Sequence, residues 1–163
     1  MRRIADKLVS SLTDWIQRFL QNKDLILRRY AKIEKLPGKE DQIMITHKDG
    51  AKHLCVVVPL VNDLNTALEP LKAYEHCTLV CYNTKENFDM LINHWERLVN
   101  FKKHFHIYFV NPFSTTLKQW AIYPHTHQII TQGQALKLGL TTLFQTVEAT
   151  TKEELEKKVG KEG

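Results

Sequence analysis

The sequence predicts an α/β protein with a mixed central sheet and helices on both of its faces. Two stretches, 4–21 and 88–99, carry apolar residues at spacings of three and four, the pattern of amphipathic helices. Short apolar runs typical of buried strands lie at 53–58, 77–82 and 105–110. Helical and strand-like segments alternate after residue 59, which favours parallel crossovers within one sheet.

The expected order of elements is a helix, a three-strand meander, a helix, a strand, a helix and a strand, followed by a C-terminal strand and helix. A chain of 163 residues is long enough to bury one sizeable core. We therefore expect residues 1–149 to form a single α/β domain. Residues 150–163 are rich in Lys and Glu, and we expect them to form a charged C-terminal tail, either a frayed helix or disordered.

The amino-terminal part is predicted to be a helix over 4–21 followed by a strand within 24–36. Trp15 and Phe19 belong to the apolar stripe of the helix, so we expect them in the core. In the second segment, apolar and charged residues alternate, which is the strand pattern, and Pro37-Gly38 then breaks it.

The stretch 41–59 predicts a β-hairpin that forms the centre of the sheet. Two apolar runs flank Asp49-Gly50, and this dipeptide is a strong signal for a type I′ turn. The second arm, 53–58, is almost entirely apolar, so we expect a strand that is covered on both faces.

The segment after the hairpin predicts a short helix, a strand and a long helix. Asn62 or Asp63 is placed to cap the first helix, which Pro70 interrupts. The strand over 77–82 is followed by Asn83-Thr84-Lys85-Glu86, which has the form of a capping box at the start of the long helix.

The C-terminal third predicts a strand over 105–110, a second strand over 119–131 and a helix over 136–147. Pro124 interrupts the second strand, which argues for an edge position or a bulge. Asn83 and Asn111 each follow a strand. They either line one crevice at the carboxyl ends of the strands or simply cap and turn the chain, the interpretation that we favour.

Composition excludes several classes of protein. No apolar run approaches the roughly 20 residues that a membrane-spanning helix needs. The amino terminus lacks a signal-peptide pattern, so we expect a cytoplasmic protein that does not bind membranes. The three cysteines have apolar flanks and are expected to be buried free thiols. No Gly-rich phosphate loop or nucleophile elbow is present, and we expect no cofactor.

The positive charge is concentrated near the amino terminus. Residues 1–39 hold ten Lys+Arg and four Asp+Glu, whereas the whole chain has a net charge of +5. This asymmetry indicates either an anionic partner reached from one side or a solvated helix face. The residues expected to contact nucleic-acid phosphates, with a tyrosine that can stack on a base, are Arg2, Arg3, Arg18, Lys23, Arg28, Arg29, Tyr30, Lys32 and Lys35.

Two His-x-His pairs suggest a metal site. On strands, His104 and His106 would share one face, and so would His125 and His127. If the two strands pair, four imidazoles converge, a set that suits zinc, copper or nickel. The simpler interpretation, which we favour, is that these histidines bind no metal and have a surface or hydrogen-bonding role, with His104 and His106 on the polar side of a half-exposed strand.

The element order over roughly residues 4–111 resembles the restriction-endonuclease-like core of the PD-(D/E)XK nuclease superfamily. In that family an Asp at the head of the hairpin and a Glu-x-Lys on its second strand hold a divalent metal. Asp41 occupies the Asp position here, preceded by Glu40 rather than Pro, but the Glu and Lys positions fall near Val56 and Val58. The resemblance therefore implies a nuclease-like domain in which Asp41 is a remnant and catalysis is absent.

Three functional hypotheses follow. The first is a non-catalytic nuclease-like domain that binds DNA or RNA, or a protein that processes them, through its basic amino-terminal surface. The second is a protein-interaction or scaffolding domain that forms homodimers or other oligomers. The third is a histidine-based, metal-dependent enzyme.

Overall fold

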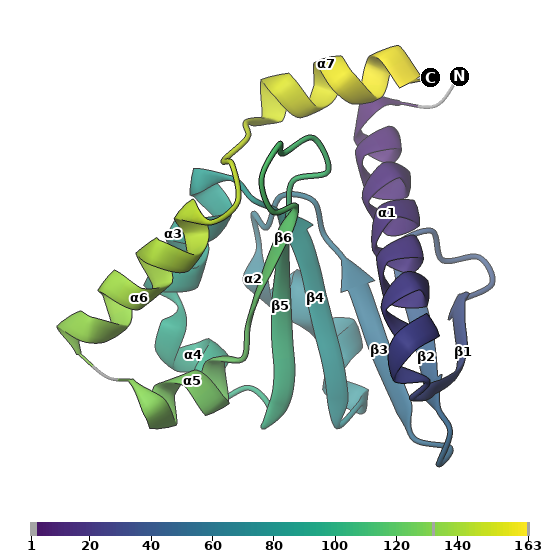
Figure 1. Ribbon diagram of the computed structural model, residues 1–163, viewed down its shortest axis with the longest axis horizontal. Coiled ribbons are helices and arrows are strands. Elements are labelled where there is room, and N and C mark those ends of the chain that lie inside the picture. The colour runs from purple at the N-terminus through teal and green to yellow at the C-terminus, as the bar shows by residue number, and fades with distance from the viewer. Residues whose placement is uncertain (1–2, 132, 163) are drawn as a thin grey trace.

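Six strands form one mixed, open sheet in the order β1-β2-β3-β4-β5-β6 in the computed structural model, which describes residues 3–131 and 133–162 (Figure 1). The strands are β1 (Tyr30–Lys35), β2 (Gln42–His47), β3 (Lys52–Val57), β4 (His76–Tyr82), β5 (His104–Val110) and β6 (Gln119–Ile122). Strands β3, β4 and β5 run parallel, whereas β1, β2 and β6 join their neighbours antiparallel.

Helices cover both faces of this sheet. One face is covered by α1 (Ile4–Leu27) and α7 (Lys152–Glu162). The other face carries α2 (Leu64–Leu68), the 3₁₀ turn η1 (Glu69–Ala73), α3 (Lys85–Asn93), α4 (Trp95–Val99), α5 (Pro124–Ile130) and α6 (Gln134–Gln145). The predicted α/β class, with a mixed sheet between two helical layers, is therefore confirmed. No helix in the described ranges is both long and apolar enough to cross a membrane.

The central hairpin forms as predicted, but its turn differs in type. All residues of β3 after Lys52 are buried, as expected for a strand covered on both faces. In the turn, Gly50 has φ +92, whereas Asp49 has a negative φ. The Gly50 N–H donates to the His47 carbonyl oxygen, and the Asp49 carboxylate accepts the Ala51 N–H. The turn is therefore a type I turn closed by a left-handed glycine, because only one residue needs a positive φ.

The first helix is longer than predicted, and the strand after it is shorter. Helix α1 continues to Leu27 and ends at Arg28, which adopts the left-handed conformation with φ 49. The Asp24 carboxylate accepts the backbone N–H groups of Arg29 and Tyr30, which turns the chain into β1. The strand predicted to start at 24 therefore begins only at Tyr30.

The predicted strand over 119–131 is wrong beyond its first four residues. Strand β6 ends at Ile122, and Pro124 occupies the first turn of α5. Proline suits that position because its fixed φ is helical and its missing N–H has no partner there in any case. The same proline that suggested a bulged strand therefore starts a helix.

The C-terminal residues expected to be a frayed helix or a disordered tail form α7 from Lys152 onward. Leu155 and Val159, one helical turn apart, are both buried against α1 and the sheet. Figure 1 shows α7 crossing the end of α1. Only two apolar residues face the core, too few to produce a recognisable stripe, so the helix depends on this tertiary contact.

Candidate functional site

Four histidines lie side by side at the end of the sheet where β3, β4 and β5 begin, which is the lower end of these strands in Figure 1. Strand register pairs His53 with His76 and His76 with His104, and His47 ends β2 beside His53. The ring centroids are 5.9 Å apart for His47 and His53, 6.3 Å for His53 and His76, and 4.6 Å for His76 and His104. We call these four residues the histidine row. Strand alternation places them on the face that α1 covers.

His53 continues into a buried polar group with Thr78 and His106. The Thr78 Oγ1 lies 2.6 Å from His53 Nε2 and 3.1 Å from His106 Nε2. A hydroxyl both donates and accepts, so it can join two neutral imidazoles. Burial, followed by the neighbouring histidines and, for His106, also by Lys23, lowers the pKa of His53 to about 4 and that of His106 to about 3. Both rings are therefore neutral at physiological pH.

A small cavity of about 90 Å³ lies over this pair at the end of α1. Its wall includes Thr78 and the two neutral histidines together with Lys23, Arg29, Tyr30 and Tyr123. Tyr123 stacks on His106, with ring centroids 4.5 Å apart. The floor of the cavity is thus a set of hydrogen-bonding side chains, and its rim is cationic.

The cationic rim belongs to a larger basic surface where α1 meets β1. Lys23, Arg28, Arg29 and Lys48 are all exposed, and the Lys48 backbone N–H donates to the Arg29 carbonyl oxygen, which brings the β2–β3 turn beside the end of α1. We call these four residues the basic corner. Within the described residues none of them forms an ion pair or a side-chain hydrogen bond with a carboxylate. The neighbouring Asp24 carboxylate already accepts two backbone N–H groups.

The residues predicted to contact nucleic acid therefore do not form one surface, because they lie at distant positions along α1 and β1. Arg3 lies at the opposite end of α1, roughly 37 Å from Arg28 at 1.5 Å per residue, and pairs with Asp6. Lys35 pairs with Asp14. Arg18 is exposed between the two ends of α1, and Lys32 is exposed on β1 near Asp24 and Leu25. Lys23, Arg28, Arg29 and Tyr30 gather at the corner. Arg2 lies outside the described residues.

The two predicted His-x-His pairs do not converge. His125 and His127 lie on α5, and residues two positions apart on a helix point in different directions. The expectation that they share the face of a strand is therefore wrong. His127 packs edge-on against Trp95, on the layer of helices opposite α1. His104 and His106 do share a face of β5, but His106 is buried with Thr78, whereas His104 is exposed.

The carboxyl edge of the sheet holds Asp41, the predicted nuclease remnant. The Val57 N–H donates to the Asp41 carbonyl oxygen at 2.8 Å, so Asp41 lies beside β3 at the head of the hairpin. An open pocket of about 490 Å³ is lined by Asp41, residues 56–60 and Asp63. The Asp63 carboxylate caps α2 by accepting N–H groups of Asn65 and Thr66. Among the described residues, Asp41 belongs to no group of three potential metal ligands.

Asn83 and Asn111 follow strands at this edge, and both serve the fold. Asn83 is fully buried, and its Nδ2 donates to the Val147 carbonyl oxygen while its Oδ1 accepts the Trp120 indole N–H. Asn111 Nδ2 donates to the Glu148 carbonyl oxygen. Both side chains attach the segment between α6 and α7 to the sheet, which is a long-range role that differs from the local capping or turning that we favoured. Asn111 also turns the chain locally, since its Oδ1 accepts the Phe113 N–H.

The three cysteines are buried and free, as predicted. Burial raises the pKa of the Cys55 thiol to about 12 and that of Cys77 to about 11, and it raises the pKa of Cys81 further. These thiols are protonated at neutral pH, so none of them is an activated nucleophile.

Comparisons with protein-family models, with curated proteins and with solved structures found no match to this chain. The function must therefore be inferred from the geometry alone.

Sequence reasoning missed His47, His53, His76 and Glu75. It counted only histidines separated by one residue, although a histidine at or near the start of each of three successive strands was visible in the sequence. The resulting edge combines imidazoles, exposed cations and a tyrosine. Such an arrangement can bind anions through its cations and a transition metal through its imidazoles.

Proposed function

We propose that this chain is a non-catalytic α/β domain that binds nucleic acid through the basic corner. The observation that carries the proposal is that Lys23, Arg28, Arg29 and Lys48 gather next to Tyr30 without carboxylates paired to them in the described part of the chain. Unpaired cations that converge from a helix end and a hairpin turn suit a row of phosphates.

The proposal that the domain is non-catalytic is supported by the side chains at the head of the β2–β3 hairpin. Asp41 lies there with Val56 and Val58, where a PD-(D/E)XK nuclease needs a second acidic group and a lysine. The other carboxylate that lines this pocket, Asp63, caps α2, so Asp41 lacks the second available carboxylate that would help it to hold the divalent ion that phosphodiester hydrolysis requires. The order of a helix, a three-strand meander, a helix, a strand, a helix and a strand adds support for a nuclease-like origin.

Nucleic-acid binding is expected to depend on salt and on the basic corner. We expect 20-nucleotide single-stranded and duplex DNA, and single-stranded RNA, to bind at low salt, with an affinity that falls as salt rises. Replacing Arg28, Arg29 and Lys48 together by Gln should weaken binding by about tenfold or more and reduce the salt dependence, because each phosphate contact contributes a slope of about 0.7–0.9. Fluorescence anisotropy at several salt concentrations measures both quantities.

The matched control removes the same charge elsewhere. Lys85, Lys152 and Lys157 are exposed on α3 and α7, and Gln at these positions should change affinity far less. Equal weakening in both variants would mean that net charge alone attracts the nucleic acid. Failure of the unmodified chain to bind any of the three probes at low salt would contradict the proposal.

A second candidate function is self-association through the last turn of α1. Leu25 and Ile26 are 73% and 86% exposed, and Leu27 follows them at 43%. Three consecutive exposed apolar side chains at a helix end suit a partner surface. Light scattering after size exclusion should then give a mass above 19.1 kDa for the unmodified chain and 19.1 kDa for Leu25→Ser with Ile26→Ser. Leu138→Ser, at a 69% exposed position on α6, is the control that should leave the mass unchanged, and a monomeric unmodified chain would contradict this candidate.

A further inference from the structure

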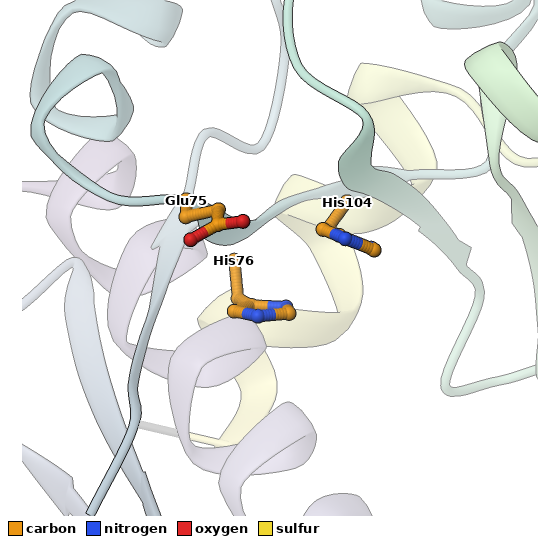
Figure 2. A group of neighbouring side chains, drawn as sticks. All are labelled: Glu75, His76 and His104. Atoms are coloured by element: carbon orange, nitrogen blue, oxygen red, sulfur yellow. The ribbon is translucent and has the colours of Figure 1, made fainter.

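At one end of the histidine row, three side chains of the kinds that bind metal ions lie close together, and none of them belongs to the basic corner. The candidate ligand atoms of Glu75, His76 and His104 all lie within 4.8 Å of one another. Figure 2 shows the three side chains gathered where β4 and β5 begin. We propose that these residues bind a divalent transition-metal ion of the zinc class. The proposal does not depend on nucleic-acid binding.

The strands hold two of the ligands in place. His76 and His104 are register partners on the central parallel strands β4 and β5, and their rings stack at a centroid distance of 4.6 Å. Neighbouring positions on a sheet are more rigid than positions on two loops, so the imidazoles need no backbone change to meet. Glu75 precedes His76 directly and brings its carboxylate to the same place.

The three side chains are available to an ion. Glu75 and His104 are exposed and His76 is half-buried. In the described part of the chain, none of the three has a side-chain hydrogen bond or an ion pair. Ligands at about 2.0–2.1 Å from a tetrahedral zinc ion lie roughly 3.3 Å apart, so the side chains must close slightly around the ion. Exposed side chains can do so by rotating about their own bonds.

The ligand types select the class of ion. Two imidazoles and one carboxylate suit zinc, cobalt, nickel or copper, whereas magnesium and calcium prefer sites made of oxygen alone. Three protein ligands leave one tetrahedral position open to an exchangeable ligand such as water. The next members of the histidine row lie outside this group of ligand atoms, and His53 Nε2 already contacts Thr78, 2.6 Å away. His47 Nε2 is buried without a hydrogen-bonding partner among the described residues, and its ring centroid is 6.2 Å from that of His76.

The test is a titration of the full chain, purified without a histidine tag, with Zn²⁺ and with Co²⁺. We expect one equivalent of Zn²⁺ to bind, measured by calorimetry against a chelator of known affinity. His76→Ala and His104→Ala should each weaken binding by more than about tenfold, because even outer-shell partners of a metal contribute about 10–100-fold in affinity. Glu75→Gln should weaken binding and change the visible absorption of the Co²⁺ form, which reports the ligand set.

The controls separate this site from other histidines and from unfolding. His94→Ala and His125→Ala remove histidines outside the row and should leave the affinity unchanged. Circular dichroism of the metal-free Glu75 and His104 variants should match that of the unmodified chain, because both side chains are exposed. Absence of stoichiometric binding would overturn the proposal. So would an affinity that is lost on substitution of His47 or His53 but retained in the His76 and His104 variants.

Discussion

Lowering the pH from 7.5 to 5.5 is expected to reduce the free energy of unfolding by about 2.5 kcal/mol, through His53 and His106. Burial, as the main cause, holds their pKa values at about 4 and about 3 in the folded protein, against 6.5 in an unfolded chain. Below pH 6.5 the unfolded chain therefore binds protons that the folded protein does not. The stability contributed by these neutral rings is complete above pH 6.5 and is lost progressively as the pH falls toward 4.

The charged neighbours of this pair make the effect stronger. After burial, the groups that lower the two pKa values are cationic or histidine side chains, namely His47 and His76 for His53, and His53 and Lys23 for His106. The wall of the cavity above the pair contains no carboxylate among the residues that line it. A proton on either ring would therefore find no compensating negative charge. Each ring contributes about 1.3 kcal/mol between pH 7.5 and 5.5, because its slope approaches the limit of about 1.4 kcal/mol per pH unit only below pH 6.5.

Urea unfolding at pH 7.5, 6.5 and 5.5 measures this dependence. Replacing both His53 and His106 by Gln keeps side chains that hydrogen-bond with Thr78 but removes the titration. This double variant should be less stable at pH 7.5 and much less sensitive to pH between 7.5 and 5.5, with a remaining dependence from His127, whose pKa burial also lowers. A double variant that loses stability with pH as steeply as the unmodified chain would show that other groups cause the effect.

The parts of the fold that sequence predicts well are those where local pattern and burial coincide. The apolar arm 53–58 and the apolar stripe that follows Thr84 each contain enough apolar residues to predict from sequence alone which residues are buried. Pro124 could not be interpreted in the same way, because a proline fits both an interrupted strand and the first turn of a helix. Helix α7 was predicted only as one of two alternatives, a frayed helix or a disordered tail, because Leu155 and Val159 stabilise a helix only through their contact with α1.

The candidate site is harder to predict than the fold because it depends on strand register. His53, His76 and His104 are separated by more than 20 residues along the chain, and they become neighbours only because β3, β4 and β5 pair in one particular alignment. A shift of one residue would move each ring to the opposite face. The basic corner has the same origin, since Lys48 joins Arg29 only through the geometry of the hairpin turn.

Replacing Asn83 by Ala is expected to destabilise the fold by about 3 kcal/mol, because the amide connects two buried partners. Its Oδ1 accepts the Trp120 indole N–H at 2.7 Å, and its Nδ2 donates to the Val147 carbonyl oxygen at 3.1 Å. Alanine would leave a buried donor and a buried acceptor unpaired, each at a cost of about 1–3 kcal/mol. The segment that leads into α7 would lose its attachment to the sheet at the same time.

Denaturant unfolding at pH 7.5 distinguishes this structural role from a role in binding a ligand. A residue that lines a crevice for a ligand could be replaced with little loss of stability, as we expect for Asn62→Ala in the open pocket beside Asp41. A double-mutant cycle with Trp120→Phe sharpens the test, because phenylalanine has no indole N–H to leave unpaired. Asn83→Ala should then cost less in the Trp120→Phe background than in the unmodified chain. Equal costs in both backgrounds would mean that the Trp120–Asn83 hydrogen bond does not hold this edge of the sheet, and that the carbonyl contacts alone attach α7.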